Sequence, residues 1–175
     1  MSATEVFVAS FGGRAFYSFE EFEKELQKYM RANHVTFVRG TSSRSSNPIL
    51  RYEKIFYRCV WYAKRKSIST GLRRVNSHDT RCPARFSITK KDNFLVVSSF
   101  EVEHNHPLNR HFFERHPVTR RLTDAELNEC STLFQLNIPS DNIKTYVAEM
   151  YGKNITTADI SNIRRKLGFP QTDDL

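Results

Sequence analysis

The chain lacks the long apolar segments that mark membrane proteins and secreted precursors. None of its apolar runs approaches the roughly 20 residues needed to cross a bilayer, and its N-terminus has no basic segment followed by a long apolar stretch. Cysteine is also scarce. The chain has three cysteines, and this small, odd number does not make a disulfide framework. We therefore expect a soluble, intracellular protein in a reducing compartment, with no membrane partner.

Motifs of the common enzyme classes are missing as well. The sequence has no internal repeat, no Gly-rich phosphate loop, no G-x-S-x-G, no H-E-x-x-H and no evident pair of carboxylates for acid–base chemistry. An enzymatic interpretation would need a nucleophile or an open metal position, and the sequence offers neither. We therefore predict that the protein is not an enzyme and has no small-molecule substrate.

The sequence does contain one complete set of ligands for a zinc ion. The ligands follow the order C-x22-C-x21-H-x-H and are Cys59, Cys82, His104 and His106. Two thiolates and two imidazoles are the donors of a closed tetrahedral zinc site, and four protein ligands leave no place for a reactive water. The pattern predicts Zn²⁺ as a structural cofactor. The simpler alternative is that the cysteines are small buried residues and the histidines lie on the surface.

Other cysteine and histidine residues fit such a site less well. Cys130 stands in a helical apolar pattern and is predicted to be a core residue. His111 and His116 follow the H-x-H pair closely enough to be alternate ligands, with a loop or phosphate contact as the other possibility.

The spacing of His104 and His106 predicts a strand end, because residues two apart share one face of a strand but lie about 200° apart around a helix. Three β-rich runs separated by polar segments precede this position, namely Leu50–Tyr62, Ala84–Thr89 and Phe94–Glu103. Side chains of the run Leu50–Tyr62 are expected to alternate between two faces. One face has Tyr52, Lys54, Phe56, Arg58 and Val60, and the other has Glu53, Ile55, Tyr57 and Cys59. The metal site would then close a small antiparallel sheet.

A helix and a further strand are predicted before these runs. Ser18 and Glu21 form a capping box, and apolar residues at helical spacing follow to about Ala32. Val35–Arg39 has the pattern of a strand, whereas Gly40–Pro48 and Ala63–Arg81 are expected to be polar, exposed loops.

Three short helices are predicted near the C-terminus. A capping box of Thr123 and Glu126 precedes the first, Leu127–Leu136. Ser140 or Asp141 caps the second, which Gly152 ends, and Thr156 or Thr157 caps the third, which runs to about Leu167.

The expected fold class is α+β: a small antiparallel zinc-binding sheet with an N-terminal helix, followed by a three-helix C-terminal segment. The predicted boundaries are residues 16–108 for the zinc-binding domain, 109–121 for a linker and 122–168 for the three helices.

The positive charge of the chain is concentrated in the predicted zinc-binding domain. The net charge is +8, yet residues 39–91 hold fourteen Lys or Arg against two acidic residues, a local balance of +12, which leaves −4 for the rest. A field of this kind attracts polyanions by releasing their condensed counterions. A solvated basic face without a partner is the alternative.

Several segments together resemble a known family. They are Ser18-Phe-Glu-Glu-Phe, Tyr57-Arg-Cys59, Cys82-Pro-Ala-Arg and Glu103-His-Asn-His-Pro107. They are similar to the far-red-impaired-response type of zinc domain in the WRKY and glial-cells-missing superfamily, which also heads Mutator-like transposases. The chain most resembles the N-terminal region of animal SWIM-type zinc-finger proteins derived from such transposases, from about residue 16 to 167.

The resemblance implies a nuclear DNA-binding protein, a transcriptional regulator derived from a transposase. Its reading edge would be the strand from Phe37 to Gly40 and the loop to Arg44. Because the chain ends at Leu175, with no room for a catalytic acidic triad, no transposase activity is expected. Residues predicted to line the sheet edge on double-stranded DNA are Arg39, Arg44, Arg51, Lys54 and Arg58, and residues predicted to contact mostly the phosphate backbone are Lys64, Arg65, Lys66, Arg73 and Arg74.

Three alternatives remain open on the sequence. The zinc sheet and the C-terminal helices could form a protein-interaction module without DNA binding. The last helix could enter a DNA groove through Asn162, Arg164, Arg165 and Lys166, or present these as an ordinary exposed face. Sheet aromatics could stack RNA bases, although their alternating spacing is typical of a core; they are Tyr52, Phe56, Tyr57, Phe86 and Phe94.

Overall fold

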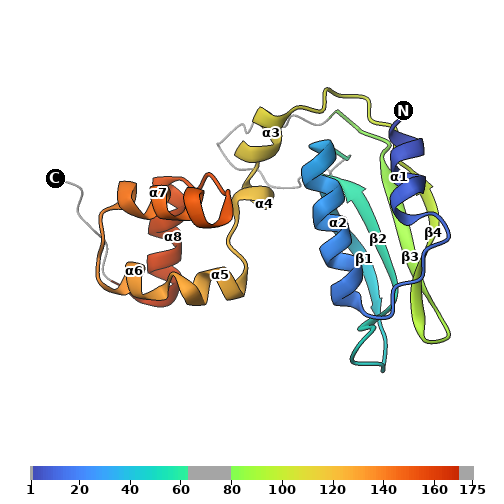
Figure 1. Cartoon of the computed structure of the whole chain (residues 1–175), viewed down its shortest axis with the longest axis horizontal. Coiled ribbons are helices and arrows are strands. Elements are labelled where there is room, and N and C mark those ends of the chain that lie inside the picture. Colours follow the sequence, from blue (N-terminus) through green and yellow to red (C-terminus); the bar gives the residue numbers. More distant parts are fainter. Residues whose placement is uncertain (1, 63–79, 170–175) are drawn as a thin grey trace, which may run out of the picture. The chain divides into compact units, whose positions relative to one another are not determined.

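A computed structural model describes residues 2–62 and 80–169 of the chain (Figure 1). The chain folds into two compact units, residues 1–109 and 110–175. In the described ranges, no helix combines the length and the apolar character that a membrane span requires.

The first unit contains an antiparallel sheet in which each strand pairs with the next one along the chain. The strands are β1 (Phe37–Arg44), β2 (Tyr52–Cys59), β3 (Arg85–Lys91) and β4 (Phe94–Glu101), in the order β1-β2-β3-β4. Together with the helices of both units, this sheet confirms the predicted α+β fold class.

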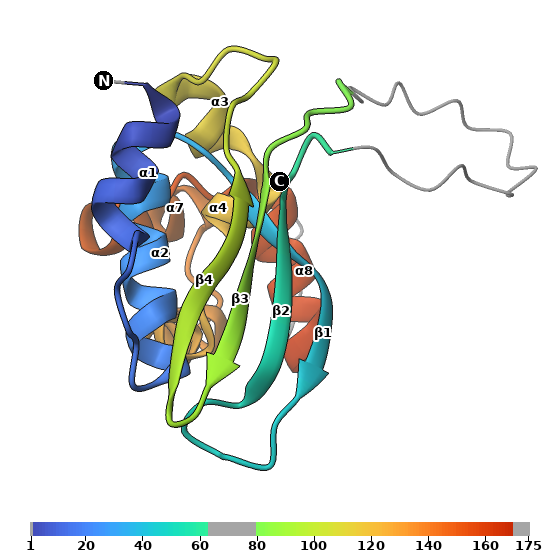
Figure 2. The same ribbon diagram turned by 90° about the vertical axis from the view of Figure 1, so that its right-hand side faces the viewer.

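Two helices, α1 (Ala3–Phe11) and α2 (Phe19–Asn33), cover one face of the sheet (Figure 2). Phe7 of α1 and Phe22 of α2 both reach Phe86 of β3, with ring centroids 5.3 and 6.4 Å away. Tyr57 of β2 stacks on the same Phe86 ring at 4.8 Å. The core of the unit is therefore aromatic, and each ring removes a large apolar area from water.

Helix α2 forms where the sequence predicts a helix, with one difference at its cap. The Ser18 hydroxyl accepts from the Glu21 N–H at 3.0 Å, as expected. The Glu21 carboxylate, however, accepts from the Tyr17 N–H at 3.0 Å rather than from that of Ser18. The helix ends at Asn33, and the C-cap residue His34 has a left-handed φ of 52°.

Helix α1 lies outside the predicted domain, which begins at residue 16. Its signals are nevertheless present in the sequence: Ser2 and Glu5 form a capping box, and Phe7 and Phe11 are buried one turn apart. Gly13, with a φ of 68°, follows the helix.

Strand β1 corrects the predicted loop, because it continues through Gly40 to Arg44. Gly40 is required here, since a Cβ atom at this position would lie 2.8 Å from Cδ1 of Phe56 on β2. The register between Arg39 and Ser42 shifts by one residue, which is a β-bulge in β1.

A second irregularity corrects the predicted faces of β2. Ser43 pairs with Lys54 and Arg44 with Tyr52, so Glu53 is the extra residue of a bulge. The bulge turns Tyr52 to the helix-covered face with Ile55, Tyr57 and Cys59, where its ring lies 5.0 Å from that of Phe19. The expected alternation holds from Lys54 to Cys59, where Ile55, Tyr57 and Cys59 are buried.

The second unit is helical. Its elements are α3 (Arg110–Arg115), α4 (Pro117–Arg120), α5 (Asp124–Glu129), α6 (Ser131–Gln135), α7 (Ser140–Tyr151) and α8 (Thr157–Leu167). Its core is apolar and consists of Leu122, Cys130, Phe134, Ile143, Val147, Ile155 and Ile160.

Local structure in this unit differs from the prediction at three places. The segment expected as a linker carries α3 and α4, and the compact unit begins at residue 110. The first predicted helix is divided into α5 and α6 at Cys130. Helix α7 begins directly at Ser140, with Pro139 as its N-cap residue and no side-chain cap. The predicted cap at Thr156 and the stop at Gly152 are confirmed.

Candidate metal centre

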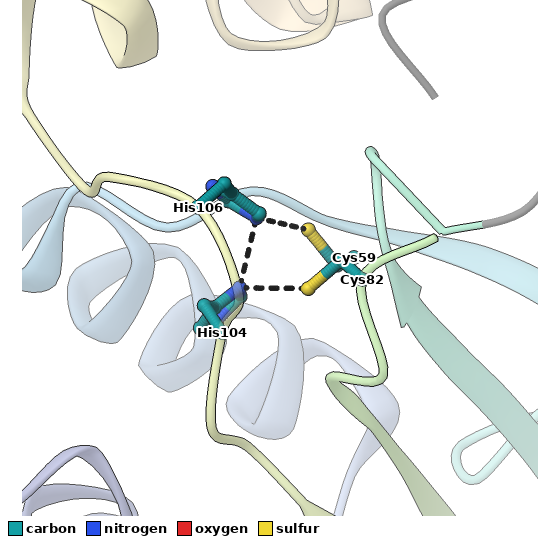
Figure 3. A group of neighbouring side chains, drawn as sticks. All are labelled: Cys59, Cys82, His104 and His106. Carbon is teal, nitrogen blue, oxygen red and sulfur yellow. Dashed lines mark hydrogen bonds between the residues drawn. The ribbon is translucent and has the colours of Figure 1, made fainter. Parts of the chain in front are cut away.

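Four side chains from three segments meet at one end of the sheet (Figure 3). The Cys59 sulfur lies 3.2 Å from Nε2 of His106, and the Cys82 sulfur lies 3.3 Å from Nδ1 of His104. The two imidazole nitrogens are 3.2 Å apart, and all four donor atoms lie within 4.8 Å of one another. The group can therefore hold one metal ion, and it contains the four residues that the spacing predicts as ligands.

The sheet brings these residues together from distant parts of the chain. Cys59 is the last residue of β2, and its N–H donates to the Ala84 carbonyl at 2.8 Å, just before β3. Cys82 precedes β3. Because β2, β3 and β4 are antiparallel neighbours, the last residues of β2, the first residues of β3 and the last residues of β4 lie at the same end of the sheet.

The histidines lie beyond the strand on which the spacing places them. Strand β4 ends at Glu101, and Val102 is buried directly after it. The two rings present different atoms to the site, Nδ1 of His104 and Nε2 of His106. The spacing of His104 and His106 therefore predicts that both side chains point into the metal-binding group. It does not predict their backbone conformation or which ring atoms face the site.

Backbone groups of Trp61 link the two cysteines. The Trp61 N–H donates to the Cys59 sulfur at 3.4 Å, and its carbonyl accepts from the Cys82 N–H at 3.1 Å. The side-chain amide of Asn105, which lies between the two histidines, donates a further hydrogen bond to the Thr80 carbonyl, two residues before Cys82, at 2.8 Å. Contacts of this kind orient metal ligands. Residue spacing gives no sign of the Trp61–Cys82 and Asn105–Thr80 contacts, because only the fold makes these residues neighbours.

Burial favours the neutral form of two of the four ligands, Cys59 and His104, in the absence of metal. Burial raises the pKa of the Cys59 thiol to about 12, although the Trp61 N–H opposes this shift. Burial, and then the positive charge that His106 can carry, lowers the pKa of His104 to about 4. A neutral imidazole can coordinate a cation directly, whereas a buried thiol gives up its proton when a cation takes its place.

The remaining cysteine and histidine residues do not join this group. Cys130 is fully buried in the core of the second unit, as predicted. The Nδ1 atom of His116 accepts from the Val118 N–H at 3.2 Å and caps α4, and His111 lies 3.3 Å from Arg115. Within residues 2–62 and 80–169, neither belongs to a group that could hold a metal. The alternate-ligand interpretation is therefore not supported.

Three of the arginines predicted to contact DNA gather around two aromatic rings, those of Phe19 and Tyr52. Arg39 and Arg51 each lie 5.8 Å from the Phe19 ring, and Arg44 lies 5.8 Å from the Tyr52 ring. Arg39 also donates to the Tyr52 hydroxyl at 2.9 Å. We call Arg39, Arg44 and Arg51 the arginine cluster.

The β-bulges explain how this cluster forms. In a regular strand, Arg39 and Arg44 would point to opposite faces, because they are five residues apart. The extra residue between Arg39 and Ser42 brings both to the same face. Arg51 forms an ion pair with Glu20 at 2.7 Å, whereas neither Arg39 nor Arg44 has an acidic partner in the described ranges.

Lys54 and Arg58 lie on the other face of the sheet, where Arg58 stands 5.6 Å from the Tyr62 ring. The structure therefore divides the five predicted sheet residues between two faces. The segment 63–79, expected as part of an exposed loop, lies outside the described residues, and with it the five predicted phosphate contacts Lys64, Arg65, Lys66, Arg73 and Arg74.

The last helix offers fewer groups than its sequence suggests. Arg164 is 1% exposed, and its guanidinium donates to the Ile138 carbonyl, so it belongs to the interior of the second unit. Asn162, Arg165 and Lys166 are exposed.

Comparison of the chain with protein-family models, with curated proteins and with solved structures found no match.

Proposed function

We propose that the ion held by the four-residue group is Zn²⁺ and that it has a structural role. A tetrahedral site with Zn–N of about 2.0 Å and Zn–S of about 2.3 Å has N–N and N–S edges of about 3.3 and 3.5 Å. The corresponding distances here are 3.2 Å between the nitrogens and 3.2 and 3.3 Å between nitrogen and sulfur. Two sulfur and two nitrogen donors in this arrangement favour zinc. Metal analysis of the purified protein should give one zinc per chain.

The function we propose is binding of double-stranded DNA by the zinc-stabilised sheet, as a transposase-derived transcriptional regulator without transposase activity. The observation that carries this proposal is the arginine cluster, with Arg39 and Arg44 on the edge strand β1. Guanidinium groups without acidic partners remain available to phosphates and to the acceptor atoms of guanine. The resemblance to the far-red-impaired-response type of zinc domain points to the same strand and to a nuclear location.

Binding of the zinc-loaded protein to a labelled DNA duplex across a salt series tests this function. If six to eight phosphates are neutralised, the logarithm of the binding constant should fall with that of salt concentration with a slope of roughly −5 to −7. The double variant Arg39→Gln/Arg44→Gln should reduce this slope by about 2. As a matched control, Lys24→Gln/Arg31→Gln removes the same charge from exposed positions of α2 and should change the slope less. A flat salt dependence would contradict duplex binding.

A protein-interaction role is the second candidate, and a groove in the second unit favours it. The groove has a volume of about 510 Å³, and the apolar residues Leu122, Leu127, Ile155 and Ile163 are among those that line it. Arg120 and Asp159, which also line it, form an ion pair at 2.6 Å. Both candidates predict zinc-dependent folding of the first unit, so the duplex titration separates them: folded, zinc-loaded protein that does not bind DNA would favour the interaction module.

A further inference from the structure

The face of the sheet opposite α1 and α2 carries a pattern that neither the metal centre nor the arginine cluster uses. We call it the open face, because none of the described helices of the first unit covers it (Figure 2). Strand register arranges its side chains in three cross-strand rows: Val38–Arg58–Arg85–Glu101, Phe56–Ser87–Ser99, and Ser43–Lys54–Thr89–Val96. Successive rows are about 7 Å apart, the length of two strand residues.

The middle row forms a hollow. Its volume is about 230 Å³, and Phe56, Arg85, Ser87, Ser99 and Glu101 are among the residues that line it. Phe56 supplies an aromatic wall, and the two paired serines are small enough to leave space above β3 and β4 on this face of the sheet. Neither serine hydroxyl makes a hydrogen bond within the described ranges. Ser99 is exposed and Ser87, which is 7% exposed, lines the hollow, so both hydroxyls can act as donor and acceptor for a ligand there.

The ring that forms the wall of this hollow is held in place by its neighbours. Phe56 lies so close to Gly40 that a Cβ atom there would be 2.8 Å from the ring. On another side, the Tyr62 ring meets it edge-on, with centroids 6.3 Å apart. A ring fixed in this way can bind a planar ligand with little loss of conformational entropy.

Charge surrounds the hollow on both sides. Arg58 and Arg85 stand directly opposite each other on neighbouring strands, a pairing of like charges that destabilises a sheet. Arg85 forms an ion pair with Glu101 at 3.1 Å, which neutralises its charge. Arg58 forms no ion pair within residues 2–62 and 80–169. The same is true of Lys54, which lies in the row on the opposite side of the hollow. A bound anion would relieve the repulsion between the arginines.

We infer that the open face binds single-stranded nucleic acid, with an unpaired base in the hollow. The base stacks on Phe56, its polar edge meets the hydroxyls of Ser87 and Ser99, and the flanking phosphates lie against Arg58 and Lys54. An aromatic platform within a basic surface is what single strands require, because their base faces are free. In a duplex, each base is stacked between its neighbours and cannot enter the hollow. This inference goes beyond the proposed duplex binding and concerns the opposite face of the sheet from the arginine cluster.

The test uses the zinc-loaded full chain and three probes of equal length: single-stranded DNA, single-stranded RNA and blunt duplex DNA. The variant Phe56→Leu keeps an apolar side chain over Gly40 but removes the stacking ring. It should weaken single-strand binding about 10-fold, because base stacking on an aromatic residue contributes on that scale. Duplex binding should not change. Tyr17→Leu is the matched control, because Tyr17 is a 67% exposed aromatic outside the hollow and should affect neither probe. Zinc content and thermal unfolding of each variant show that it is folded.

Stronger binding of RNA than of DNA would assign the ligand to RNA, and equal or stronger DNA binding would assign it to single-stranded DNA. Equal single-strand affinity of the wild type and Phe56→Leu would overturn the inference, as would a parallel loss of duplex and single-strand binding in that variant. Binding of single strands without binding of duplex would contradict the proposed duplex function and leave the open-face inference standing.

Discussion

Cys82 offers a sharp test of the metal centre at the scale of one residue, because the chain has a buried cysteine outside the centre, Cys130. We expect Cys82→Ser to lower metal affinity by at least 100-fold, because the site loses a thiolate ligand. The stability of the first unit should fall by about 3 kcal/mol or more, because the other three ligands are then left in the site without a tightly bound metal. Zinc content and chemical denaturation followed by Trp61 fluorescence measure the two effects.

Cys130→Ala is the matched control for this substitution. It removes a buried sulfur from the core of the second unit and should leave one zinc per chain. If Cys82→Ser retained full zinc content, a different ligand set would have to hold the metal.

In the second unit, the Glu126 carboxylate accepts a hydrogen bond from the buried Lys153 ammonium. Burial of the carboxyl by itself raises the pKa, but the Lys153 ammonium and the Thr123 N–H outweigh it, so the pKa of Glu126 lies below its ordinary value of 4.5. A group whose pKa is lowered by folding stabilises the protein above its ordinary pKa, and this contribution is lost as the pH falls through the folded value.

Glu126→Gln should therefore destabilise the second unit by about 2 kcal/mol at pH 7, because a hydrogen bond between charged partners is lost. The difference from the wild type should shrink as the pH falls below 4.5, the ordinary pKa of the group. Urea denaturation at several pH values, followed by far-UV circular dichroism, measures this. Glu149→Gln, at an exposed position of α7, is the control. A pH-independent difference would show that the charge of Glu126 is not what stabilises the unit.

At the scale of an element, strand β1 depends on a residue without a side chain. We expect Gly40→Val to destabilise the first unit by about 1–3 kcal/mol, because its Cβ atom would stand 2.8 Å from the Phe56 ring and force it to move. Thr41→Val, at the next and exposed position, should change stability by less than about 0.5 kcal/mol. The midpoint of urea unfolding, monitored by Trp61 fluorescence, distinguishes the two. Equal effects would mean that β1 and β2 are not in the register described.

The same strand shows how element boundaries escape sequence reasoning. Gly40, Ser42 and Ser43 are residues of loops and turns by composition, and they predict a loop. The pairing of Ser42 with Ile55 and of Ser43 with Lys54 overrides that preference, because backbone groups of β1 gain hydrogen-bond partners on β2. Helix α1 shows the opposite case, since its capping box and its Phe7–Phe11 pair are local signals that sequence reasoning could have used.

At the scale of the whole molecule, two units with separate cores should unfold separately. Removal of the metal by a chelator should lower the unfolding midpoint of the first unit, where the four ligands lie, and leave the second unaffected. The single tryptophan, Trp61, reports on the first unit, and far-UV circular dichroism is weighted towards the helices of the second. Coincident transitions that shift together on chelation would contradict this prediction.

The order of residues along the chain was enough to predict the α+β class, helix α2, the buried alternation of β2 from Lys54 to Cys59, and which four residues meet in a metal-binding group. These depend on local periodicity, on capping residues and on the chemistry of thiol and imidazole donors, all of which can be read along the chain. The proposed functions remain predictions that the experiments above test.

The face that each basic residue occupies follows instead from the pairing of the strands and could not be predicted from the chain. A bulge of one residue reverses every side chain beyond it, and bulges arise from pairing between strands rather than from the strand's own sequence. They placed Arg39 and Arg44 together on one face and turned Tyr52 into the core, while Lys54 and Arg58 remained on the other. Packing likewise buried Arg164 in the second unit, where the sequence alone allowed it to lie on the surface.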